Sequence, residues 1–175
     1  RHTPGVTKIS TQKVWEDGEN QDGLRPAKVG VQLYGDDKAV GTEIELNAGN
    51  NWSYTWKDLP EKANGKTIKY TVKEIGVPKG YESTSEVIDG RIVLTNRHTP
   101  GVTKISTQKV WEDGEDQDGL RPGNIRVQLY GNGEAVGDEV ILNVANNWRY
   151  TWEDLPEKTN GKTIKYTVKE TGVPK

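Results

Sequence analysis

The segment RHTPGVTKISTQKVWEDGE, which begins at Arg1, recurs at Arg97 and gives the sequence a repeat period of 96 residues (97 − 1). The register holds far along the chain, because GKTIKYTVKE occurs at Gly65 and again at Gly161. A period of this length far exceeds that of solenoid repeats and matches the size of a complete domain. The sequence therefore predicts a tandem array of separately folding domains.

The two copies differ in length. The first continues through GYESTSEVIDGRIVLTN (80–96), whereas the sequence ends at Lys175 before any counterpart of that segment. We therefore expect the second copy to lack its final strand and the chain to come from a longer array. The predicted parts are the tail and joint of a preceding repeat (1–5), a complete first repeat (6–97), a short polar joint (98–101) and an incomplete second repeat (102–175).

Each copy contains short runs in which polar and apolar residues alternate, separated by turn sequences such as GDD, AGNN and ANGK. No run keeps a helical period for more than a turn or two, so the pattern indicates strands. DLPEK (58–62) is interpreted as a turn. Strands at this spacing in a domain of roughly 100 residues are typical of an all-β, antiparallel sandwich of the immunoglobulin-like kind. The predicted strands of the first copy are 9–15, 29–34, 43–46, 52–56, 68–74 and 91–96.

The composition excludes several classes of function. The chain has no Cys, which rules out disulfides, thiolate metal sites and Cys nucleophiles. A net charge of −2, evenly spread, does not indicate a nucleic-acid surface or a membrane contact. Only 31% of the residues are hydrophobic, so the six Trp and seven Tyr must carry much of the core. Trp52, Tyr54 and Trp56 are accordingly predicted to point inward rather than to form a sugar-binding platform.

Three polar residues fall on strand faces that are otherwise apolar. They are Lys13, Glu74 and Asn96, each on a different predicted strand. Any one of them alone fits a strand end turned to solvent, and Lys13 with Glu74 fits a simple ion pair. Because an unpaired buried charge is very costly, the three together favour a functional site. Their apolar neighbours on the same faces are Ile9, Trp15, Tyr70, Val72, Ile92 and Leu94.

These residue types can react with one another. A neutral Lys13 amine can attack the carbonyl carbon of Asn96, form an amide between the side chains and release ammonia. Burial favours the neutral amine, and it also favours a protonated Glu74 that polarises the carbonyl and shuttles protons. Fixed strands would hold the groups at high effective concentration. The sequence predicts a Lys13–Asn96 isopeptide bond formed in a single turnover, and no turnover enzyme.

The motifs KVWED, LRP, DLPEK, YTVKE and LTN, in this order, resemble those of CnaB-type repeats, the stalk domains of Gram-positive surface adhesins and pilins. The resemblance covers the first copy and the second copy up to its end. It implies an inverse immunoglobulin-like sandwich and an internal Lys–Asn isopeptide bond assisted by an acidic residue. The matching positions are Lys13, Glu74 and Asn96. In the second copy Lys109 and Glu170 match, but the segment that would carry the Asn is absent from this chain.

The resemblance implies a stalk or spacer on a bacterial cell surface, attached to the cell wall through a parent protein. The expected partners are neighbouring repeats and a host extracellular-matrix ligand bound through the parent, with no cofactor and no metal. Carboxylates in the loop 15–26 could hold calcium, but their spacing fits no EF-hand, so a solvated loop is favoured. The alternative function is a tandem immunoglobulin-like binding module that recognises host protein or carbohydrate by its loops. The near-identity of the copies favours the spacer.

Overall fold

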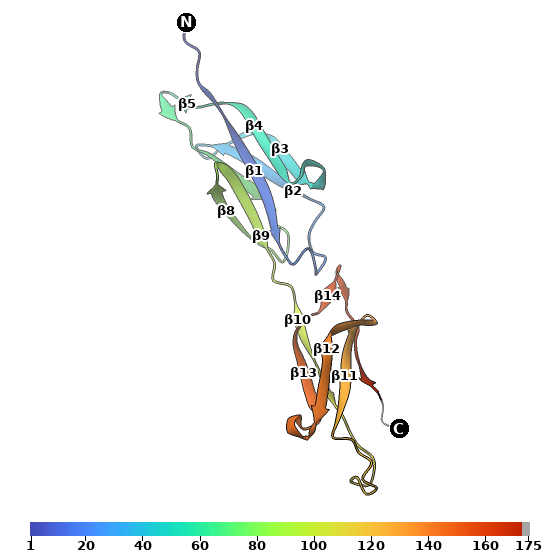
Figure 1. Cartoon of the computed structure of the whole chain (residues 1–175). Helices are drawn as coiled ribbons and strands as arrows, with labels where there is room; N and C mark the ends of the chain where they lie inside the picture. Colours follow the sequence, from blue (N-terminus) through green and yellow to red (C-terminus); the bar gives the residue numbers. More distant parts are fainter. Residues whose placement is uncertain (173–175) are drawn as a thin grey trace. The chain divides into compact units, whose positions relative to one another are not determined.

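The computed structural model describes residues 1–172 and divides into two units, Arg1–Thr99 and Pro100–Lys175 (Figure 1). Both consist almost entirely of strands, joined by tight turns and one short 3₁₀ turn per unit. The first unit contains β1 (Val6–Glu16), β2 (Lys28–Gly35), β3 (Lys38–Asn47), η1 (Ala48–Asn50), β4 (Ser53–Pro60), β5 (Lys62–Ala63), β6 (Lys66–Thr67), β7 (Tyr70–Ile75), β8 (Glu82–Ile88) and β9 (Arg91–Arg97).

Two larger sheets form the sandwich of the first unit, one with strand order β4-β1-β9-β8 and the other with order β3-β2-β7, and β5 pairs with β6 in a small separate sheet. The first and last long strands, β1 and β9, lie side by side and run parallel (Figure 1). Lys13 is opposite Leu94 and Trp15 is opposite Asn96 in this pair. The predicted all-β sandwich is confirmed, although the β1–β9 pair departs from purely antiparallel pairing.

The core of the first unit lies between these sheets. Its buried side chains come from both: Val31 and Leu33 from β2, Leu46 from β3, Val72 from β7 and Leu94 from β9. Close packing of these branched side chains excludes water from the space between the sheets.

The aromatic row behaves as predicted at two of its three positions. Trp52 and Trp56 are partly buried and pack against the core. Tyr54 is 38% exposed, so its inward assignment was wrong. It lies on β4, the edge strand of its sheet, and packs edge-on against Trp56 with 5.0 Å between ring centroids.

Two features of the first unit were not predicted. The strand β8 was missed because ESTSEVI has little apolar alternation, and all seven of its residues are exposed. DLPEK is not a simple turn: Leu59 belongs to β4 and is buried. Asp58 adopts a φ of 55° where the β1–β4 register shifts, as in a β-bulge that turns Leu59 toward the core.

The second unit repeats much of this architecture. It contains the sheets β10-β13, β12-β11-β16 and β14-β15, and its buried core includes Ile125, Val127 and Leu142. Among residues 100–172, β10 pairs only with β13, and there is no counterpart of β8 or β9. Val110 is 67% exposed as a result. The strands are β10 (Val102–Gln108), β11 (Asn124–Gly131), β12 (Glu134–Asn143), β13 (Arg149–Pro156), β14 (Lys158–Thr159), β15 (Lys162–Thr163) and β16 (Tyr166–Thr171), with η2 (Val144–Asn146).

No helix within residues 1–172 has the length and apolar character needed to cross a membrane.

Candidate functional site

Lys13, Glu74 and Asn96 meet inside the first unit, and each comes from a different strand. Lys13 is on β1 and Asn96 is on β9, its parallel neighbour. Because Lys13 pairs with Leu94, Asn96 lies two residues further along β9 on the same face. Glu74 belongs to β7 of the facing sheet. The site therefore spans both layers of the sandwich.

Glu74 contacts both of the other groups. Lys13 Nζ donates a hydrogen bond of 2.7 Å to Glu74 Oε2. Asn96 Nδ2 donates one of 2.8 Å to Glu74 Oε1. One carboxyl group thus bridges the amine and the carboxamide, and the ion pair considered as the simpler alternative is part of the same arrangement.

The site is closed to solvent. The side chains of Lys13 and Glu74 are 0% and 2% exposed, and Asn96 is fully buried. Burial lowers the pKa of Lys13 below its ordinary value, while the hydrogen bond and negative charge of Glu74 act in the opposite direction. A buried amine of lowered pKa gives up its proton more readily than a surface lysine does.

The carboxamide is oriented differently from the sequence-based expectation. That expectation placed the acid against the Asn96 carbonyl, whereas Nδ2 is the atom that faces Glu74. The carbonyl oxygen Oδ1 is buried and has no hydrogen-bond partner. A half-turn of the amide about its last side-chain bond would exchange the two atoms and bring Oδ1 to the acid.

Aromatic rings cover the amine. The Trp15 ring centroid lies 4.8 Å from Lys13 Nζ. Trp15 packs edge-on against Trp52 at 5.4 Å and against Tyr81 at 5.2 Å. The π face of Trp15 stabilises a cation at Nζ, and the Trp52 and Tyr81 rings pack against Trp15 and help to exclude water.

Sequence reasoning missed a second buried polar cluster beside this aromatic cover. The Asp17 side chain is 1% exposed and accepts hydrogen bonds from Arg25 Nε at 3.0 Å and Arg25 Nη2 at 2.6 Å. Tyr81 Oη donates to the same carboxylate at 2.7 Å, and so does the backbone N–H of Asn20 at 2.9 Å. The interpretation of this loop as merely solvated was wrong for Asp17.

Hydrogen bonds to the Asp17 carboxylate lower its pKa and keep it ionised. Burial alone would raise its pKa, but the bonds from Arg25, Tyr81 and the Asn20 backbone outweigh burial and lower the pKa from 3.8 to about 2. A signal for the cluster exists in the sequence, since an Asp and an Arg eight residues apart recur as Asp113 and Arg121. Among residues 1–172, no group of three or more Asp, Glu or His side chains is arranged to hold a metal ion.

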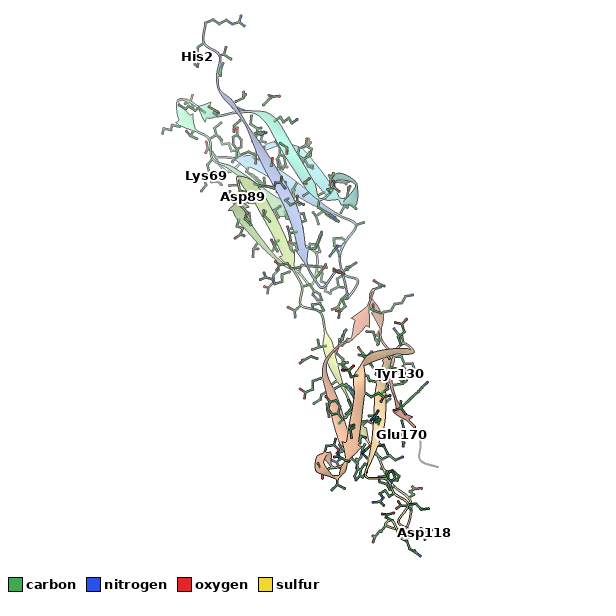
Figure 2. All side chains as sticks on the ribbon, viewed as in Figure 1. His2, Lys69, Asp89, Asp118, Tyr130 and Glu170 are labelled. Atoms are coloured by element: carbon green, nitrogen blue, oxygen red, sulfur yellow. The ribbon has the colours of Figure 1, made fainter. Side chains whose placement is uncertain are left out.

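The second unit holds only part of the site. Lys109 Nζ lies 2.8 Å from Glu170 Oε2, and the side chains are 23% and 18% exposed. Glu170 is on β16 (Figure 2), and Lys109 lies just beyond the end of β10. Glu170 Oε1 is buried without a partner; its counterpart in the first unit accepts the Asn96 hydrogen bond.

Comparisons with known proteins agree with these two units. The family model for the Cna protein B-type domain matches residues 9–97 and 105–175. A collagen adhesin from Staphylococcus aureus is 45% identical over 171 residues, which cover 97% of this chain and 14% of that adhesin. The crystal structure of two B repeat units (B1B2) of the collagen binding protein of S. aureus matches with a TM-score of 0.89 and 44% identity. That match covers 98% of this chain and 46% of the crystallised chain.

A crystal structure of a single B repeat unit (B1) from the same organism's collagen binding surface protein is 42% identical. Its TM-score is 0.47, with 98% of this chain and 88% of that chain covered. The chain spans only about a seventh of the length of the S. aureus collagen adhesin to which it is 45% identical. The resemblance drawn from the sequence motifs is confirmed.

Proposed function

Because the chain belongs to the family of Cna protein B-type domains, we propose that its repeats are structural spacers of a bacterial surface adhesin, the first one locked by a Lys13–Asn96 isopeptide bond. Ligand binding to host matrix is then a property of other parts of the parent protein, which also attach it to the cell wall. The proposed partners of each repeat are the neighbouring repeats of the array.

A single observation carries the proposal of a crosslink. Glu74 makes hydrogen bonds of 2.7 Å and 2.8 Å to an amine and a carboxamide that are both buried. A buried ion pair could serve stability alone, but it would not need a carboxamide with an unsatisfied oxygen beside it. The same three groups are the reactants and the proton carrier of amide exchange.

The reaction begins with a proton transfer along the short Lys13–Glu74 hydrogen bond. The transfer leaves a neutral amine and a neutral acid, which a dry site favours over two charges. The Asn96 amide turns so that Oδ1 accepts a hydrogen bond from Glu74, and this bond polarises the carbonyl. The Lys13 nitrogen then attacks Cγ of Asn96 and forms the new C–N bond.

Collapse of the tetrahedral intermediate breaks the bond from Cγ to Nδ2. Glu74 passes the proton that Nζ loses on attack to Nδ2, which leaves as ammonia, and the ammonia then takes from Glu74 the proton that Lys13 gave it in the first step. In total, a lysine ammonium and a carboxamide become a secondary amide and an ammonium ion. Glu74 returns to its starting state after this single turnover.

The position of the crosslink suits a spacer under tension. Force applied to the ends of the repeat enters at β1 and leaves at β9, which are adjacent and parallel. An amide between Lys13 and Asn96 would carry that force directly from one strand to the other. The intervening residues 14–95 would then bear no tension, and the repeat could not be extended.

Intact-mass measurement of the whole chain tests the crosslink. The purified chain should weigh about 17 Da less than its sequence, which corresponds to one ammonia. The variants Lys13→Ala and Asn96→Ala should show the full masses of their own sequences. Lys109→Ala is the matched control and should keep the loss, because the second unit has no Asn partner. A wild-type chain of full mass would reject the bond.

The spacer role has its own test. A chain carrying only these two repeats should not retain collagen or other matrix proteins in a pull-down. Retention at micromolar protein concentrations would favour the alternative of a binding module, whatever the mass of the chain.

A further inference from the structure

The ring of His98 is held by two acceptors at the point where the chain leaves the first repeat. His98 follows β9 directly, and its backbone N–H donates to the carbonyl oxygen of Glu16 at 2.9 Å. Its Nε2 lies 2.8 Å from Oδ2 of Asp22, and its Nδ1 lies 2.9 Å from the carbonyl oxygen of Gly80. The His98 and Asp22 side chains are only 17% and 12% exposed.

These two partners determine the protonation state of the ring. A backbone carbonyl and an ionised carboxylate can only accept hydrogen bonds, so both ring nitrogens must donate. A neutral imidazole carries one N–H and can satisfy only one of the two contacts. The arrangement is therefore complete only when His98 is an imidazolium.

From this geometry we infer that His98 is a proton-dependent clasp: when charged, it holds the start of the joint, together with the adjacent end of β9 (residues 97–99), to two loops of the first repeat, and when neutral it loses one of its two hydrogen bonds. The clasp ties the joint to two loops that are far apart in sequence. Asp22 is in the β1–β2 loop, and Gly80 precedes β8. The inference does not depend on the isopeptide bond.

The charges around the ring favour the clasped state. The hydrogen bond that His98 donates to Asp22 is the main cause that raises the pKa of His98, and partial burial opposes it. The Gly80 carbonyl and the negative charges of Asp22 and Asp17 add to the rise. The Tyr81 ring packs against the imidazole with 5.6 Å between centroids. Arg25 is a nearby cation, but it forms its ion pair with Asp17.

Two further charged groups at this end of the repeat form an ion pair with each other. Arg97, next to His98, makes an ion pair with the Glu16 side chain on the surface. A raised pKa means that the clasp is at full strength below the ordinary histidine value of 6.5 and is lost as the pH rises through the higher folded-state value. The joint should thus be more firmly held in mildly acidic than in alkaline solution.

Nuclear magnetic resonance of the whole chain can test the clasp, because the sequence has only two histidines and His2 is exposed. We expect the His98 midpoint to lie above the ordinary histidine value of 6.5 and the ring to carry protons on both nitrogens at its acidic plateau. The backbone amide signals of residues 97–99 should move with the His98 midpoint. Replacing Asp22 by Asn should bring the His98 midpoint down toward 6.5.

The second unit supplies the matched control. Asp118 occupies the position equivalent to Asp22 and is exposed at the loop that follows β10, as Figure 2 shows. Asp118→Asn should therefore leave both histidine midpoints unchanged. The inference is overturned if the His98 midpoint is not above 6.5, if it is unaffected by Asp22→Asn, or if the amides of 97–99 do not follow it. His98→Gln should keep the core amide signals and abolish the pH response of the joint.

Discussion

Glu74 reaches Lys13 from the opposite sheet of the sandwich, with 2.7 Å between Oε2 and Nζ. The acid and the amine are 61 residues apart in sequence, so only the closed fold brings them together. Burial between the sheets also lowers the pKa of the amine. Any reaction of this site must therefore follow folding, and it should depend on the acid as strictly as on the two reactants.

Replacing Glu74 by Gln tests the role of the acid with the least change in shape. A glutamine keeps the size of the side chain, but it cannot accept the Lys13 proton and pass it to the leaving nitrogen. We expect Glu74→Gln to retain the full mass of its sequence after days at 25 °C, while the wild-type chain shows a loss of about 17 Da. Glu170→Gln in the second unit should behave like the wild type. Loss of ammonia by Glu74→Gln would show that the acid is dispensable.

The crosslink should make a large contribution to stability. It would close a loop of 83 residues (96 − 13), which joins the two ends of the domain. By analogy with a disulfide that closes a loop of similar length, the free energy of unfolding of the first unit should be about 4 to 5 kcal/mol higher than without the bond. Asn96→Ala should lower the free energy of unfolding of the first unit by at least this amount. The measurement is urea unfolding, followed by the backbone amide signals of β2 and β7. A difference below about 1 kcal/mol would contradict a covalent link.

Alternation along single strands was sufficient to identify two of the groups that meet at the candidate site, because Lys13 and Asn96 each interrupt an apolar face. It could not give the parallel β1–β9 register or the orientation of the Asn96 amide, since both depend on how distant strands meet. The strand β8 escaped prediction for a related reason. It is an edge strand that forms by pairing with β9, and all of its residues are exposed, so its own sequence shows no alternation of buried and exposed positions.

The Asp17 cluster shows another limit of sequence reasoning. Six of the seven residues from Glu16 to Asp22 are polar, which is the composition of a solvated turn. The loop instead folds over Asp17, because Arg25 and Tyr81 together supply three of its hydrogen bonds. Tyr81 lies 64 residues away in sequence, so no local pattern could indicate it.

Asp17 should make the first unit sensitive to acid. Its pKa is lowered from 3.8 to about 2, despite burial, by the hydrogen bonds from Arg25, Tyr81 and the Asn20 backbone. A carboxylate with a lowered pKa stabilises the fold above the unfolded value of 3.8, and this contribution is lost as the pH falls through about 2. The shift corresponds to roughly 2 kcal/mol at pH 7.

We therefore expect Asp17→Asn to lower the free energy of unfolding of the first unit by about 2 kcal/mol at pH 7 and to have little effect near pH 2. Urea unfolding at several pH values measures this difference. The control is Asp113→Asn in the second unit, where the carboxylate makes the same pair with Arg121 but is 29% exposed. Its effect on the second unit should be smaller. Equal losses at pH 7 and pH 2 would assign the effect of Asp17 to packing rather than to charge.

The partial site in the second unit allows a gain-of-function test. Lys109 and Glu170 are already 2.8 Å apart, and Glu170 Oε1 is buried without the hydrogen bond that Asn96 supplies in the first unit. A chain extended beyond Lys175 by a second copy of the sequence 80–97 would bring an Asn to the free edge of β10. We expect this chain to lose two molecules of ammonia, about 34 Da, instead of one.

Two variants of the extended chain make this test specific. Lys109→Ala should return the loss to about 17 Da, and so should replacement of the added Asn by Ala, because each removes one reactant of the second bond. Lys13→Ala should also leave a loss of about 17 Da, now from the second unit alone. Peptide mapping would distinguish these cases by the crosslinked pair. If the extended chain folds its second unit and still loses only one ammonia, then an amine, an acid and a carboxamide in this fold are not sufficient for the reaction.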